Sequence, residues 1–533
     1  MGQGDERSPK MESQQYQPQP YQPMVYQQQQ PYPVQQQPQQ GYGYNQTYQQ
    51  QQPQPQPQQP MMYQQVQPND NMKQPLLSQQ PGGNGIYVSP FAEPQGSKFP
   101  EKPPYRDLMF HILFYLNIVG VILLYIVSLS KDVLVYEYIN SSESSDSYST
   151  TYDTSADYSM TILGLCALSV CYSLAFIFVW MKLASKYPKQ LITWTFIGNF
   201  ILCGIILVLY IVFFNLVMVV IMAIVMVVNL LFFFMWRKRI EFTGTLLTNT
   251  THLLSNFPGA YRVAYGSLVV SLTWFTLWGL AFQRSILVYE GYTFYGVSIY
   301  LVFSLYWVGN VIKNVVHTTV AGLFSSWYFL AGNQMGMPSN PTMGALKRSM
   351  TTSFGSIAFG SLLLAIISTL RYISNMLQNS KNGILVLIGC FFNCILAIMQ
   401  SVLAFFNTYN FAMIAIYGES YCDSGKRTVE LFTHRLGSLL VNDDFISVCL
   451  SFSALLGGAV GGIFGLIATK IIYDSLLGGV FVFFVCFIVI LMALEIVYSG
   501  VVTLFVCFMM DPNILAQTKP EIYKLYISTY KIK

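Results

Sequence analysis

Charged residues are scarce in this sequence. Asp, Glu, Lys and Arg make up 10% of its 533 residues, whereas about 25% is usual for a soluble domain. Hydrophobic residues account for 53%. This balance excludes an ordinary soluble domain, and the net charge of +4 gives no indication of a nucleic-acid partner. The composition instead indicates a membrane protein whose partner is the lipid bilayer.

Cysteine and histidine are few as well, with nine and four residues respectively. All of the cysteines except Cys422 fall within long apolar runs, so the sequence predicts no extracellular disulfide framework. The histidines are scattered singly, and no apolar run holds a cluster of metal ligands or a nucleophile beside a base. We therefore expect no metal site, no cofactor and no enzymatic activity.

The apolar residues are collected into ten long runs. Each run can cross a bilayer as an α-helix, which satisfies its own backbone hydrogen bonds in lipid. The sequence therefore predicts an all-α polytopic membrane protein. The predicted spans are Leu108–Leu129, Met160–Met181, Leu191–Phe213, Leu216–Trp236, Tyr261–Phe282, Tyr295–Val316, Met350–Arg371, Ile384–Phe406, Phe445–Thr469 and Val480–Met510.

Basic residues predict how the chain is oriented. Most of the 28 Lys and Arg residues flank the spans on one side, and the positive-inside rule then places both termini in the cytoplasm. Residues 1–103 are rich in Gln, Pro and Tyr without apolar periodicity, so we expect a disordered cytoplasmic tail. This tail is either a solvated extension or a segment that binds cytoplasmic partners. Residues 104–520 form the ten-helix domain, and residues 521–533 a short cytoplasmic tail.

The connection after the first span should face outside. Asn140, Ser141 and Ser142 form a glycosylation sequon on that side. Asn140 is therefore the predicted modification site.

Two charged residues lie away from the ends of the predicted spans. Lys313 falls in the sixth span and Glu495 in the tenth, and a charge at membrane depth is costly unless it is paired or functional. At ~1.5 Å per residue, their depths below Tyr295 and Val480 agree to within one helical turn. The two side chains can therefore pair, either as a structural lock or as a switch in which a substrate or proton competes with Lys313. His317 is a candidate for titration near the cytoplasmic side.

Aromatic residues accompany these charges. Aromatic faces beside a carboxylate suit a quaternary ammonium, which has no N–H donor and is held by cation–π contact. Interfacial belts of Trp and Tyr offer a second explanation for the same residues. The candidate cage residues are Trp274, Trp278, Tyr306, Trp307 and Tyr498.

Four separated segments carry a family resemblance. They read HTTVAGLFSSWYF from His317, SFGSIAFGSLL from Ser353, NTYNFAMIAIYGESYC from Asn407 and ALEIVYSGVVTLFVCFMMDP from Ala493. In order, spacing and ten-span layout they resemble the choline transporter-like family. The Gln/Pro-rich tail and the short first outer loop resemble the fungal branch, the pH-nine-sensitive proteins.

The resemblance implies a choline transporter-like fold and a plasma-membrane transporter of choline or a related quaternary amine. Within such a path we expect Glu495 to be the anionic or proton-linked group and Lys313 its competing counter-charge. A channel or lipid scramblase stays open as an alternative, and so does a non-transporting membrane scaffold or sensor.

Overall fold

The computed structural model describes Phe99 and residues 103–140, 149–213, 216–236, 240–331, 336–473, 477–521, 523–524 and 527. These described residues form helices and connections, without any β-strand. The prediction of an all-α polytopic protein is confirmed. The predicted N-terminal tail falls outside the described residues, apart from Phe99 and Pro103.

Ten helices within the described residues are long and apolar enough to cross a membrane, as the ten runs predict. The three shorter helices are α5, α8 and α13. In chain order the helices are α1 (Leu108–Asn140), α2 (Ser149–Lys186), α3 (Pro188–Val212), α4 (Leu216–Trp236), α5 (Ile240–Asn256), α6 (Gly259–Val288), α7 (Gly291–Leu330), α8 (Pro341–Met350), α9 (Phe354–Gln378), α10 (Gly383–Tyr417), α11 (Tyr421–Tyr473), α12 (Leu477–Met510) and α13 (Pro512–Thr518).

Local sequence sets several helix ends. Pro188 begins α3 at a position where its missing N–H is not needed. The side chain of Asn382 caps α10 by accepting a hydrogen bond from the backbone N–H of Ile384 at 3.0 Å. α10 ends at Gly418, whose φ of 63° lies in the left-handed region that favours glycine.

Several helices extend beyond the predicted spans, and the seventh span is predicted to begin at the wrong residue. The sequence predicts a seventh span from Met350 to Arg371, but Met350 ends α8 and α9 begins at Phe354. Thr351 leaves the helical region, with φ of −123° and ψ of −86°, so a turn separates the two helices. α9 then continues past Arg371 to Gln378. Arg371 therefore lies within the span and not at its edge.

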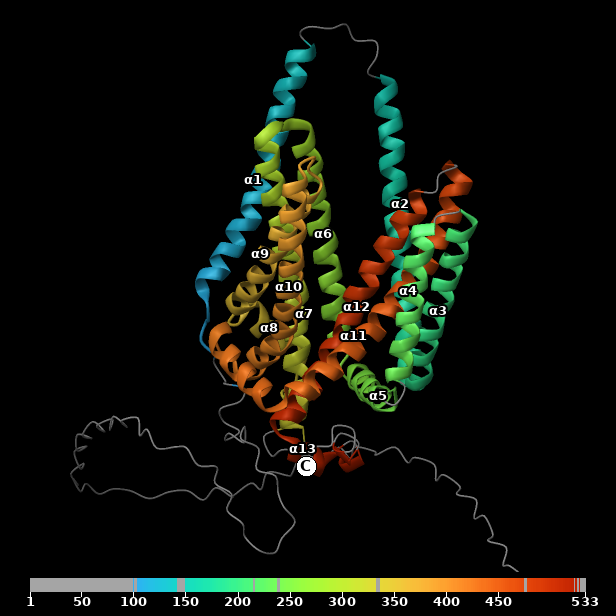
Figure 1. Ribbon diagram of the computed structural model, residues 1–533. Helices are drawn as coiled ribbons and strands as arrows, with labels where there is room; N and C mark the ends of the chain where they lie inside the picture. Colours follow the sequence, from blue (N-terminus) through green and yellow to red (C-terminus); the bar gives the residue numbers. More distant parts are fainter. Residues whose placement is uncertain are drawn as a thin grey trace, which may run out of the picture. The chain divides into compact units, whose positions relative to one another are not determined.

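The spans are arranged in two groups (Figure 1). α1, α6, α7, α9 and α10 pack together, and α2, α3, α4, α11 and α12 form the second group. Contacts of α12 with α7 and α6, and of α10 with α11, join the groups. α5 and α13 lie at one end of the bundle, which we call the α5 end. The other end, where α1 finishes and α2 begins, is the α1–α2 end.

Glycine allows close packing within the second group. A Cβ on Gly462 of α11 would lie 2.9 Å from the Cβ of Phe483 in α12, and Gly458 faces Phe487 in the same way. Small residues at four-residue spacing let two membrane helices approach closely. This contact therefore fixes α11 against α12.

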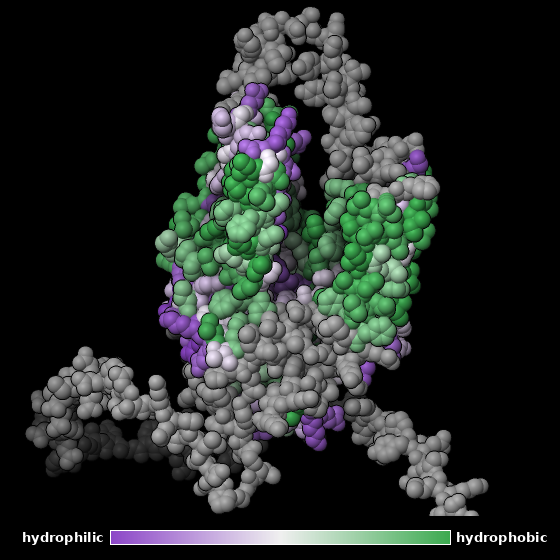
Figure 2. Space-filling model, viewed as in Figure 1, coloured by the Kyte–Doolittle hydropathy of each residue, from purple (hydrophilic) through white to green (hydrophobic). Residues whose placement is uncertain are grey.

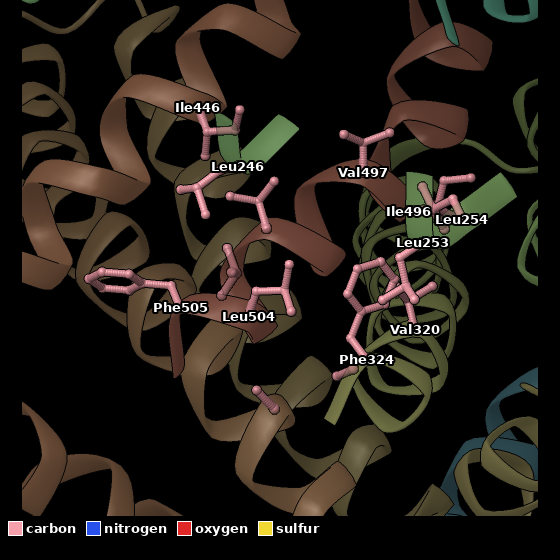
Figure 3. Close-up of a cluster of buried hydrophobic side chains, with 14 of the residues drawn as sticks. Leu246, Leu253, Leu254, Val320, Phe324, Ile446, Ile496, Val497, Leu504 and Phe505 are labelled. Carbon is pink, nitrogen blue, oxygen red and sulfur yellow. The ribbon is translucent and has the colours of Figure 1, made fainter. Parts of the chain in front are cut away.

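Apolar side chains close the bundle at the α5 end (Figure 3). Those that come from α5, α7 and α12 are all buried, and the figure also labels Ile446 of α11. Gly500 of α12 packs on this cluster, where a Cβ would lie 2.7 Å from the ring of Phe324. We call the cluster the apolar plug. Its members are Leu246, Leu253, Leu254, Val320, Phe324, Ile496, Val497, Leu504 and Phe505.

Candidate transport site

Lys313 of α7 and Glu495 of α12 lie side by side within membrane-spanning segments. Lys313 Nζ lies 3.5 Å from Glu495 Oε2. The lysine side chain is 52% exposed, whereas the glutamate side chain is 11% exposed. A mostly buried carboxylate is thus held by a cation that keeps access to open space. Because an ammonium on a flexible four-carbon stem can swing away, this contact is suited to an exchange of partners.

His317 lies beside the second oxygen of the same carboxylate. Its Nδ1 is 3.6 Å from Glu495 Oε1 and 2.7 Å from the hydroxyl of Ser499. Its Nε2 lies 2.9 Å from the backbone oxygen of Thr408. Because a carbonyl oxygen can only accept, Nε2 carries the hydrogen, and Nδ1 of the neutral ring accepts from Ser499. Nδ1 is therefore the ring atom that can take up a proton next to Glu495.

Lys313 and Glu495 line a polar cavity of about 430 Å³. Its walls come from α7, α9, α10, α11 and α12, so both groups of helices contribute. Figure 2 shows the molecule hollowed between the two groups from the α1–α2 end, with hydrophilic residues deep in the hollow. The apolar plug packs around the neighbouring turns of α7 and α12. The polar cavity therefore lies beside the apolar plug.

A polar stripe on α10 forms part of the cavity wall. Gln400, Ser401, Ala404, Asn407 and Thr408 all line the cavity. Their spacing of three and four residues places them on one face of the helix. A polar stripe on an apolar span indicates a face toward water or substrate. The residues predicted above do not include this stripe, although its periodicity is visible in the sequence.

Arg371 of α9 is a further charge that lies away from the ends of its span. Its Nε donates to Asn393 Oδ1 at 3.1 Å, and its Nη1 donates to Gln400 Oε1 at 2.5 Å. Gln400 Nε2 donates in turn to the hydroxyl of Ser368 at 3.1 Å, and both of these residues line the cavity. Among the described residues no carboxylate pairs with Arg371. Neutral amides therefore hold this guanidinium behind the cavity wall.

The structure does not bring the candidate cage residues together. Tyr498 lines the cavity beside Glu495. Trp274, Trp278 and Trp307 lie in a separate apolar cluster of α1, α6, α7 and α9. Tyr306 is likewise outside the residues that line the cavity. The cavity thus contains one of the five predicted aromatic residues.

Hydrogen bonds to neighbouring helices explain the positions of two of these tryptophans. Trp278 Nε1 donates to the backbone oxygen of Leu301 at 2.7 Å, and Trp307 Nε1 donates to that of Ala358 at 3.0 Å. A buried indole N–H requires an acceptor, so both side chains fasten neighbouring helices. Phe405 of α10, which the sequence analysis did not select, supplies the second aromatic side chain of the cavity.

A short segment before α1 is tied to the cavity wall. The carboxylate of Asp107 accepts hydrogen bonds from the hydroxyl of Ser356 at 2.6 Å and from the backbone N–H of Tyr421 at 2.8 Å. The phenol of Tyr421 donates to Asn407 Oδ1 at 2.6 Å, and Asn407 lines the cavity. Burial raises the pKa of Tyr421 to about 12. A chain of hydrogen bonds thus connects Asp107 with the site.

Asn140 is the last residue of α1. The other two residues of its sequon lie outside the described residues. Glycosylation at Asn140 stays a prediction.

The residues of the site lie within a region that matches a known protein family. The sequence profile of the plasma-membrane choline transporter family matches residues 220–513. This range contains Lys313, His317 and Glu495, together with all four segments that carry the resemblance.

Related proteins match over most of the chain. A CTL-like protein of Dictyostelium discoideum is 39% identical over 454 residues, which are 85% of this chain and 80% of the relative. A second CTL-like protein of the same organism is 30% identical over 446 residues, 82% and 84% of the two chains. Protein PNS1 of Debaryomyces hansenii is 28% identical over 397 residues, 69% and 74% of the two chains. The similarity therefore extends well beyond the four segments.

Proposed function

This chain belongs to the choline transporter-like family, and from that premise we propose that it is a plasma-membrane transporter of choline or a related quaternary amine. Family membership supports the class of membrane transporter. The observation that carries the choice of a cationic substrate is the contact between half-exposed Lys313 and Glu495 in the polar cavity.

The substrate cation takes the place of the Lys313 ammonium at Glu495. A quaternary ammonium has no N–H to donate, so charge and aromatic faces must hold it. Tyr498 and Phe405 offer those faces, since both line the same cavity as Glu495. The displaced Lys313 side chain turns into the open part of the cavity, where its charge is solvated.

The polar side chains of Gln400 and Ser368 in the cavity wall suit the hydroxyl group of an amino alcohol. Because Arg371 occupies the oxygen of the Gln400 amide, this side chain offers its N–H groups toward Ser368 and the cavity. A substrate hydroxyl can accept from such a donor. Choline carries both groups that this cavity would recognise, a quaternary ammonium and a hydroxyl.

His317 provides a link to protons. When Nδ1 takes up a proton, it changes from an acceptor into a donor next to Glu495. The imidazolium then shares the carboxylate charge, and the hold on a bound cation weakens.

The apolar plug supports alternating access. A channel needs a continuous polar path. Here the buried apolar side chains of the plug lie at the α5 end. In a transporter, such a barrier opens only after the cavity has closed on its substrate.

Uptake of radiolabelled choline into proteoliposomes tests the proposal. The full chain should give saturable uptake that changes with an imposed pH gradient. Glu495→Gln should lower uptake at least about tenfold, because it removes the charge that holds the cation. Glu290→Gln is the matched control, since Glu290 is an exposed residue at the start of α7.

Other outcomes decide between the alternatives. Ion or lipid flux without saturable amine uptake would indicate a channel or scramblase. Normal choline uptake by Glu495→Gln would contradict the role given to this carboxylate.

A further inference from the structure

A long apolar groove lies behind the helix that carries Lys313. It has a volume of about 960 Å³ and is bounded by α1, α6, α7 and α8. Val311 and Val315 of α7 line this groove, whereas Asn310 and Lys313 line the cavity. α7 thus separates a polar space from an apolar one.

One end of the groove is polar and carries a cation. Arg262 near the start of α6 lines it, together with Asn256 and with Asn340 and Thr342 at the start of α8. Arg262 is exposed and forms no ion pair with any described residue. α6 and α8 begin here without side-chain caps, and a Cβ on Gly259 would lie 3.0 Å from that of Thr342, so their N-termini are close. A guanidinium beside two helix N-termini favours an anion.

The rest of the groove matches a hydrocarbon chain in length and polarity. From Arg262 to Leu277, both of which line it, α6 rises roughly 22 Å at ~1.5 Å per residue. One leaflet contributes about 15 Å to the hydrocarbon core. Val269 and Val270 expose apolar side chains along this length. An extended acyl chain can therefore follow α6 from the polar end.

Apolar side chains of α8 line the groove next to its polar end. Met343 and Met350 of α8 line the groove and are more than half exposed. Unbranched methionine side chains adapt to irregular apolar surfaces. Together with Leu346 they can cover the part of a lipid where its chains begin.

We propose that this groove binds one anionic glycerophospholipid, with its phosphate and headgroup at Arg262 and an acyl chain along α6. Basic pockets between membrane helices bind such headgroups through their charge. A zwitterionic phospholipid carries no net negative charge toward Arg262, and a sterol offers this guanidinium no anion. The bound lipid would brace α7 from the face opposite Lys313, without touching the substrate.

Native mass spectrometry of the full chain released from nanodiscs tests this site. In phosphatidylcholine nanodiscs that contain a minor share of phosphatidylserine, the chain should retain one phosphatidylserine in preference to phosphatidylcholine. Arg262→Gln should lower this retention about fivefold, the ratio that corresponds to ~1 kcal/mol for one basic side chain near the surface. Arg262→Lys should keep most of it. Lys347→Gln is the control, since this exposed cation on α8 does not line the groove.

A second pair of variants tests the acyl chain. Val270→Trp places a large side chain in the groove and should abolish retention. Leu280→Trp makes the same change at an exposed position of α6 outside the groove, and retention should equal that of the unaltered chain. Size-exclusion chromatography identifies variants that do not fold, and the two Arg262 variants decide the question if Val270→Trp is among them.

Three results overturn the proposal. One is equal retention of phosphatidylcholine and phosphatidylserine by the unaltered chain. Another is retention of a sterol in place of a phospholipid when both are supplied. The third is phosphatidylserine retention by Arg262→Gln that equals retention by Lys347→Gln.

Discussion

The two halves of α7 face different surroundings. Toward the α1–α2 end, Asn310 and Lys313 border the polar cavity. Toward the α5 end, Leu323 and Phe324 are fully buried, with Phe324 in the apolar plug. His317 lies at the boundary between the halves, where it contacts α10 and α12. The same helix thus borders open space along one half and is closely packed along the other.

A change of surroundings along one helix indicates which contacts would alter if the plug opened. α12 changes in the same way, from Glu495 in the cavity to Val497 and Phe505 in the plug. Because α7 and α12 join the two groups of helices, a shift between the groups changes both halves together. Opening the plug while closing the cavity would exchange access from one side to the other.

Breaking the closed half should have the largest effect. Phe324→Ala leaves a void in the fully buried plug and should lower the free energy of unfolding by about 3–5 kcal/mol. It should also let solutes leak through proteoliposomes. Thermal unfolding and dye release measure the two effects. Phe391→Ala is the control, because Phe391 is 63% exposed on α10 and its truncation leaves no buried void. An equal loss of stability in both variants would show that the plug is no tighter than the periphery.

Breaking the charged half should cost less. Lys313→Met leaves Glu495 without its ammonium, and a charge left alone in a fully buried pair costs about 3–5 kcal/mol. Since Lys313 is half exposed, the loss should be smaller than this. The double variant with Glu495→Gln should regain part of it. Removing the exposed pair of Asp423 and Lys426 should leave the unfolding midpoint unchanged. A double variant less stable than both single variants would contradict the pairing.

The sequence predicts the fold more fully than the site. Ten apolar runs predict the ten long helices because helix length in a bilayer is fixed by its thickness. The depths of Lys313 and Glu495 could also be compared by counting residues, and the structure places the two groups 3.5 Å apart. Depth is a local property of each span, so one sequence suffices to estimate it.

Which helix a side chain faces is not a local property. Trp278 and Trp307 lie in apolar spans, but their N–H groups find backbone acceptors on neighbouring helices, and periodicity does not identify such partners. Arg371 seemed to flank a span because its helix extends further than the minimum length. Phe405 lines the cavity because it lies near the polar stripe of α10, the face of the helix that turns inward. Packing between helices decided each of these cases.

A smaller effect is expected where the segment before α1 packs against the start of α9. Gly355 lies against the backbone oxygens of Arg106 and Asp107, where a Cβ would clash. Gly355→Ala should therefore cost about 1–3 kcal/mol and loosen the bonds of Asp107. Thermal unfolding measures the cost. Gly204→Ala is the control, since no atom lies within 4 Å of its added Cβ, and it should stabilise α3 by up to about 1 kcal/mol. Equal behaviour of the two variants would exclude a tight contact at Gly355.

The smallest effect should come from the hydrogen bond between Tyr421 and Asn407 of the cavity wall. Tyr421→Phe removes the hydrogen bond to Asn407 and should cost about 1 kcal/mol at neutral pH. Its contact with Asp107 uses the backbone N–H and is kept. If choline uptake falls with little loss of stability, the phenol positions Asn407 in the cavity wall. Unchanged uptake would limit Tyr421 to a structural role.

The pH dependence of stability measures how much Tyr421 contributes to the loss of stability at alkaline pH. Burial raises the pKa of Tyr421 to about 12, against an ordinary value of about 10. Between these values the folded chain keeps the phenolic proton that the unfolded chain gives up, so the free energy of unfolding falls as pH rises. Phenylalanine cannot ionise, and Tyr421→Phe should lose less stability over this interval. Parallel curves for the two proteins would show that the alkaline loss arises elsewhere, and that burial does not hold the phenolic proton of Tyr421.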